Sequence, residues 1–139
     1  MRVLLDTNVV LDLYLDRIPF ADAAAALWQA HEQGDLVGYV SSITPVNIYY
    51  IAQKLKDERT ARQAVIELLS TLRVCPTDQL VLSAAIELPI RDYEDAVQIA
   101  CAMSMSLDAI VTRNLDDYAS SPIPVYAPTD FLQKYLPDA

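Results

Sequence analysis

The chain has 139 residues, of which 53% are hydrophobic, and this length suits one domain with a full core rather than two. Its 19 acidic and 10 basic residues give a formal net charge of -9, which argues against a protein that coats nucleic acid through bulk positive charge. The charge does not exclude a metal-dependent enzyme, because bound cations reverse the local sign. We expect a single domain over residues 1–139.

Cysteine, histidine and glycine usage excludes several kinds of site. Cys75 and Cys101 are isolated and lie in apolar stretches, which predicts buried thiols in a reducing cytoplasm. His31 is the only histidine, so a His-dependent triad or a multi-His metal site is not expected. The sequence has only two glycines, which rules out a glycine-rich phosphate loop. No apolar run reaches the ~18 residues of a membrane span, so no membrane partner is expected.

The first half of the chain alternates between strand and helix patterns. The apolar run Val3 to Leu5 predicts a strand buried on both faces, and helices are expected over 9–15 and 21–33. A strand over 37–40 precedes a helix that ends near Leu55, for which Thr44 is the expected N-cap and Pro45 the first helical residue.

The second half continues the same alternation. Helices are expected over 60–69, 78–88, 93–105 and 129–135, strands over 73–75, 109–111 and 125–126, and a polar loop over 112–118. Strands that alternate with helices pair in parallel, because each helix carries the chain back across the sheet. The sequence thus predicts an α/β fold with three layers, in which helices flank a mostly parallel central sheet of four to five strands.

Polar and acidic residues recur where this fold would place one crevice. Asp6 directly follows the first strand, Asp95 and Asn47 lie near helix starts, and Asn114 to Asp117 follow the fourth strand. The carboxyl ends of parallel strands and the first turns of the helices share one edge of such a sheet. Each group also has a local explanation as a cap, a first-turn amide or a solvated turn. The local explanations do not account for the gathering of acidic groups at one edge.

Three segments resemble the acidic signatures of the PIN-domain family: Leu4-Leu5-Asp6-Thr7-Asn8, Asp92-Tyr93-Glu94-Asp95-Ala96 and Val111-Thr112-Arg113-Asn114-Leu115-Asp116-Asp117-Tyr118. Their order and spacing match across essentially the whole chain, and its small size is similar to the VapC-type toxins of bacterial toxin–antitoxin pairs. The resemblance implies a Mg²⁺- or Mn²⁺-dependent endoribonuclease that acts on RNA, with an antitoxin partner and a homodimeric state. By position, Asp6, Asp95 and Asp117 match the metal-binding carboxylates.

Residues next to these carboxylates are candidates for substrate binding. Thr112, Arg113 and Asn114 follow the fourth strand, and the guanidinium fork of Arg113 suits a phosphate. A local ion pair of Arg113 with Asp116 or Asp117 is the alternative.

Asn47, a further candidate catalytic residue, stands where the family usually has a glutamate. Its carbonyl can ligate a hard cation but brings no charge. Glu94 could compensate, although its side chain points about 100° away from that of Asp95 around the helix. The chain is therefore either an active endoribonuclease or a PIN-like module with weakened catalysis that binds RNA or protein. A phosphotransferase with Asp6 as nucleophile is disfavoured, because Asn8 stands where a second aspartate is expected.

Overall fold

The strands form one parallel sheet. The computed structural model describes residues 1–137, and within them five strands pair in the order β3-β2-β1-β4-β5. All four pairings are parallel. The strands are β1 (Arg2–Leu5), β2 (Val37–Ser41), β3 (Arg73–Cys75), β4 (Ala109–Val111) and β5 (Val125–Tyr126). The predicted parallel α/β sheet is confirmed.

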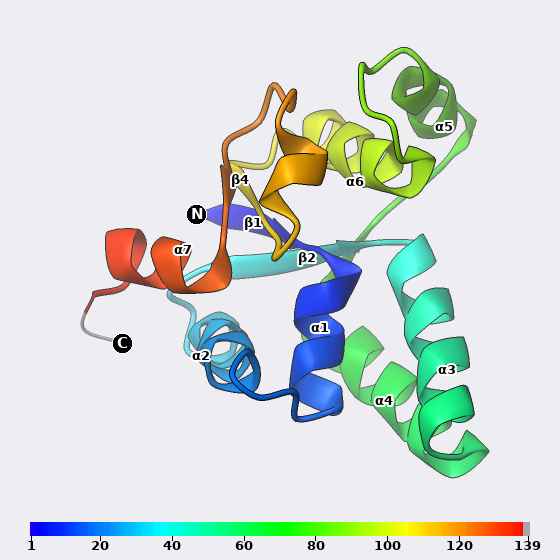
Figure 1. Cartoon of the computed structure of the whole chain (residues 1–139), viewed down its shortest axis with the longest axis vertical. Helices are drawn as coiled ribbons and strands as arrows, with labels where there is room; N and C mark the ends of the chain where they lie inside the picture. The colour runs from blue at the N-terminus through cyan, green and yellow to red at the C-terminus, as the bar shows by residue number, and fades with distance from the viewer. Residues whose placement is uncertain (138–139) are drawn as a thin grey trace.

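Helices cover both faces of the sheet (Figure 1). They are α1 (Thr7–Tyr14), α2 (Ala21–Glu32), α3 (Ile43–Leu55), α4 (Glu58–Thr71), α5 (Gln79–Ile86), α6 (Tyr93–Ser104), α7 (Pro128–Tyr135) and the 3-10 helix η1 (Leu115–Tyr118). α1 to α4 and α7 lie on one face, and α5 and α6 lie on the other. The expected arrangement in three layers is confirmed.

The central strand β1 divides its side chains between two cores. Val3 and Leu5 pack with α1, α2 and α7 in one cluster, whereas Leu4 packs with α5 and α6 in the other. All three side chains are buried, as the continuous apolar run predicts. Burial of each contributes about 1.5–3 kcal/mol, so the end of β1 is a fixed position in the molecule.

Among the local predictions that differ from the structure, three concern segments next to the candidate site residues. α1 begins at Thr7, because the Asp6 side chain caps it by accepting a hydrogen bond from the Thr7 N–H. α3 begins at Ile43, so the predicted N-cap Thr44 is wrong: its hydroxyl is buried and bonds to that of Thr7 instead. Residues 115–118 form η1 within the predicted loop.

Two further features concern the chain as a whole. Cys75 and Cys101 are both buried free thiols, as predicted. No helix in the described range 1–137 is long and apolar enough to cross a membrane.

Candidate active site

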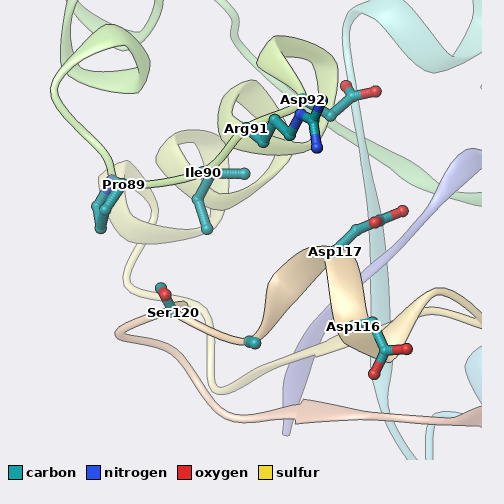
Figure 2. Close-up of a pocket in the computed structure, with 8 residues that line it drawn as sticks. Pro89, Ile90, Arg91, Asp92, Asp116, Asp117 and Ser120 are labelled. Atoms are coloured by element: carbon teal, nitrogen blue, oxygen red, sulfur yellow. The ribbon is translucent and has the colours of Figure 1, made fainter.

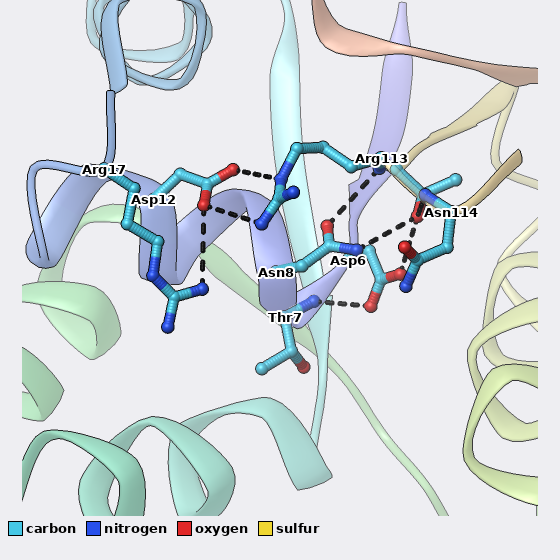
Figure 3. Close-up of polar contacts among 8 residues, drawn as sticks. Asp6, Thr7, Asn8, Asp12, Arg17, Arg113 and Asn114 are labelled. Carbon is cyan, nitrogen blue, oxygen red and sulfur yellow. Dashed lines mark hydrogen bonds and ion pairs between the residues drawn. The ribbon is translucent and has the colours of Figure 1, made fainter. Parts of the chain in front are cut away.

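Asp6 is a buried carboxylate at the end of the central strand, with only 5% of its surface exposed. Its Oδ1 accepts a hydrogen bond from the Thr7 N–H at 2.6 Å, and its Oδ2 accepts from Thr112 Oγ1 at 2.8 Å and Tyr118 OH at 3.0 Å. Figure 3 shows Asp6 between the start of α1 and the segment that follows β4. Burial raises the pKa of Asp6, whereas the hydrogen bonds from Thr112 and Tyr118 lower it.

The Tyr118 hydroxyl links Asp6 to Asp95. It lies 3.0 Å from Asp6 Oδ2 and 3.2 Å from Asp95 Oδ1, and its single proton is shared between the two carboxylates. Burial, followed by the charges of Asp6 and Asp92, raises the pKa of Asp95 to about 7. Burial also raises the pKa of Tyr118, so this hydroxyl stays protonated as a donor. Tyr118 was not expected at the site, and the only signal was its place directly after Asp117.

Asp117 lies across an open cleft from the start of α6. The cleft has a volume of about 550 Å³, and Figure 2 shows Arg91 and Asp92 on one side of it and Asp117 on the other. The negative charge of Asp117 raises the pKa of both Asp6 and Asp95, so the three predicted metal ligands act on one another electrostatically. Arg91 forms no ion pair within residues 1–137. It was not expected at the site, because nothing in its spacing distinguishes it from other surface arginines.

Asn47 faces Glu94. The Asn47 Nδ2 donates a hydrogen bond to Glu94 Oε1 at 2.6 Å, which joins α3 to the first turn of α6. Because α3 begins at Ile43, Asn47 lies in its second turn rather than in the predicted first turn. The structure therefore brings a carboxylate to the place where Asn47 itself supplies none.

A buried polar contact joins three helices, through the first turns of α1 and α3 and the second turn of α6. Thr7 Oγ1 and Thr44 Oγ1 lie 2.9 Å apart, and Gln98 Nε2 lies 3.4 Å and 3.5 Å from them. All three side chains are buried. Hydrogen bonds between buried polar groups are costly to break, so this contact fixes α1, α3 and α6 relative to one another beside Asp6.

The side chain of Arg113 is bound to Asp12 on α1. Its Nε and Nη2 donate to the two Asp12 carboxylate oxygens at 2.6 and 3.0 Å, and the Phe20 ring lies 4.0 Å from its Cζ (Figure 3 shows the ion pair). The alternative ion pair with Asp116 or Asp117 is therefore wrong: Arg113 pairs with the buried Asp12, which also lies 3.8 Å from Arg17.

Thr112 and Asn114, the other two candidates for substrate binding, differ in exposure. Thr112 is fully buried, donates to Asp6 and accepts a hydrogen bond from the Asn114 N–H at 3.0 Å. Asn114 is exposed. Thr112 therefore holds Asp6 in place. Of these two residues, only Asn114 has a side chain that is accessible to a ligand.

The oxygen ligands at this edge suit a hard divalent cation. Within residues 1–137, no three acidic, histidine or cysteine side chains converge closely enough to enclose a metal ion on their own. Mg²⁺, however, is usually held by one or two carboxylates together with several waters. Asp6 and Asp95, joined by one hydroxyl and with no basic group offsetting their raised pKa values, provide such a pair.

The Asp12–Arg113 ion pair generates a prediction about stability. Arg113→Met leaves the buried Asp12 carboxylate without its bidentate partner, and we expect it to lower the free energy of unfolding by about 2–3 kcal/mol. The double variant Asp12→Leu with Arg113→Met should lose less than the sum of the single variants, because no buried carboxylate is left without its partner and Arg17 is more exposed. Urea unfolding of the four proteins measures this coupling; additive losses would contradict it.

The raised pKa of Asp95 predicts a pH dependence without metal. The unfolded chain releases this proton near the ordinary value of 3.8, whereas the folded chain holds it until about pH 7. The free energy of unfolding should therefore fall between about pH 4 and pH 7, by about 1 kcal/mol after solvent screening. Thermal unfolding in chelator at several pH values measures it. Asp95→Asn should remove this part of the slope, and an unchanged slope would refute its origin in Asp95.

Comparisons with known proteins agree with this fold. A family model described as a PIN domain matches residues 2–116. A search of curated protein sequences finds no match. Among solved structures, a toxin–antitoxin complex from Klebsiella pneumoniae is 26% identical with a TM-score of 0.67, and covers 91% of this chain and 97% of that one.

Two further structures show the same fold at lower identity. DNA-bound VapBC from Salmonella typhimurium is 20% identical with a TM-score of 0.72, over 92% of this chain and 98% of that one. The Mycobacterium tuberculosis toxin VapC20, which cleaves the sarcin–ricin loop, is 16% identical with a TM-score of 0.63, over 78% and 86%. Since the family model matches most of its length, the chain belongs to the PIN-domain family.

Proposed function

We propose that the protein is a Mg²⁺- or Mn²⁺-dependent endoribonuclease and the toxin of a toxin–antitoxin pair. The observation that carries the proposal is the joined pair of Asp6 and Asp95 beside Asp117, a concentration of negative charge at the carboxyl edge of the sheet. The guanidinium of Arg113, which follows β4 close to Asp6 in the fold, is already paired with Asp12. A divalent cation would neutralise these carboxylates, and a phosphodiester is a substrate that needs such a cation.

The chain's own residues would divide the work as follows. When bound, Mg²⁺ or Mn²⁺ would supply the positive charge that polarises the phosphodiester and activates an attacking water. Asp6, Asp95 and Asp117 would hold the cation, and Thr112 and Tyr118 would orient Asp6 through their hydroxyls.

The open cleft beside Asp117 would admit an RNA strand. Arg91 has no ion-pair partner in the described part of the chain and can contact a phosphate there, and Asn114 supplies an exposed amide nearby. Arg113 would position the segment after β4 through Asp12 rather than bind substrate with its full fork.

The similarity to toxin–antitoxin complexes supports a proposal about the partners. We propose that an antitoxin protein binds this chain and that it forms a homodimer, in a cytoplasm where Cys75 and Cys101 remain reduced. VapBC from Rickettsia felis and from Salmonella typhimurium, each with one chain of this fold, were solved as complexes with DNA.

A second candidate function is a PIN-like module that binds RNA or protein without cutting it. Asn47 favours this reading, because the amide brings no charge to a site that relies on carboxylates. RNA cleavage distinguishes the two functions, since a module without catalysis can bind a cation but cuts no RNA.

A cation should stabilise the folded protein. Mn²⁺ or Mg²⁺ should raise the melting temperature, because it relieves repulsion of about 4 kcal/mol for each pair of carboxylates ~4 Å apart at an effective dielectric of 20. Asp6→Asn should raise the melting temperature of the metal-free protein and abolish the response to cation, since Thr112 and Tyr118 hydroxyls can accept from the new amide. Differential scanning calorimetry measures both effects. Unchanged melting curves in both experiments would count against the site.

Cleavage of RNA should depend on the same residues. The purified protein should cut structured RNA in Mn²⁺, and Asp6→Asn and Asp95→Asn should each lower the rate at least about 100-fold, because each removes a carboxylate that holds the cation. Denaturing gels of end-labelled RNA give the rate, with chelator and Glu32→Gln, at the opposite edge of the sheet, as controls. Cation binding without cleavage would favour the binding module.

A further inference from the structure

Asn47 on α3 and Glu94 on α6 form a hydrogen-bonded pair between the two helices. Glu94 accepts only, so the hydrogen bond of 2.6 Å requires that Asn47 presents its Nδ2 to Glu94 Oε1. Asn47 Oδ1 and Glu94 Oε2 then remain as oxygen ligands. Together the pair carries one negative charge, as a single glutamate at position 47 would.

Buried contacts one helical turn away from Asn47 and Glu94 place this pair near the candidate site. Thr44 lies one turn before Asn47 on α3, and Gln98 lies one turn after Glu94 on α6, so both pairs share the same helix faces. Thr44 bonds to Thr7, the residue after Asp6, and Gln98 Nε2 lies 3.5 Å from Thr44 Oγ1. The Asn47–Glu94 pair therefore lies above a buried contact that is itself next to Asp6.

The side chains of Asp95 and Glu94 contact different neighbours of α6. Asp95 faces η1, where Tyr118 joins it to Asp6, whereas Glu94 faces α3 through Asn47. Successive residues of a helix point about 100° apart, so Asp95 and Glu94 point toward different neighbours of α6. This angle does not remove Glu94 from the site.

We propose that Glu94, held by Asn47, is the carboxylate that completes the divalent-cation site, in place of the glutamate that PIN domains usually have at position 47. This assignment rests on the proposed function. The site keeps its number of negative charges but takes one of them from α6 instead of α3, so the Asn47 amide positions a ligand rather than marking a lost one.

The test compares Mn²⁺ affinity by isothermal titration, which needs no RNA. Glu94→Gln keeps the hydrogen bond with Asn47 but removes the charge, and we expect it to bind Mn²⁺ about 10- to 100-fold more weakly than the wild type. Glu32→Gln, an exposed glutamate at the end of α2, is the matched control and should bind like the wild type. Without metal, Glu94→Gln should raise the melting temperature at low ionic strength, because one of several crowded negative charges is removed.

The double variant Asn47→Glu with Glu94→Gln returns the charge to α3 and should regain most of the lost affinity. If the wild-type chain binds Mn²⁺ through Asp6 and Glu94→Gln binds it equally well, this assignment fails but the proposed function does not. A double variant as weak as Glu94→Gln would also contradict the assignment. If the wild-type chain binds no Mn²⁺, the assignment and the proposed function both fail.

Discussion

The site depends on a carboxylate that the fold has largely removed from water. Asp6 is 5% exposed at the end of the central strand, and an ionised carboxylate in such a place costs several kcal/mol unless hydrogen bonds or a cation compensate it. The Thr7 N–H, Thr112 and Tyr118 supply part of that compensation. The start of α1 and the segment after β4 therefore both contribute hydrogen bonds that satisfy one charge.

The rest of the compensation is missing from the described chain. Asp95 shares the Tyr118 proton with Asp6 and has its pKa raised to about 7, so the two carboxylates hold fewer charges near neutral pH than they could. Such an arrangement is unfavourable for folding alone and favourable for binding a cation, because the cation recovers the energy of repulsion. The ion pair of Arg113 with Asp12 occupies the guanidinium that follows β4, so Arg113 does not neutralise Asp6 or Asp95.

Much of this could be predicted from the sequence because it follows from local patterns. The apolar run before Asp6 predicts a central strand, and alternation predicts the parallel sheet that collects strand ends at one edge. The partner of Arg113 could not be predicted, because Asp12 lies on another element and only the folded chain brings them together. The role of the Tyr118 hydroxyl could not be predicted for the same reason. Its partner Asp6 lies on another element, and the sequence alone does not distinguish Tyr118 from a core residue.

Asn47 illustrates that the negative charge of such a site can be supplied from a different helix than the one expected. The resemblance to the family implies that a glutamate is replaced at this position, and from the sequence alone a weakened enzyme is one of the two expectations. In three dimensions a cation responds to the oxygens and charges around it and not to the helix that carries them. Glu94 lies within hydrogen-bonding distance of the amide that replaces the glutamate. If Glu94 is a ligand, as we propose, the pair preserves the charge of the site, and its geometry depends on the packing of α3 against α6.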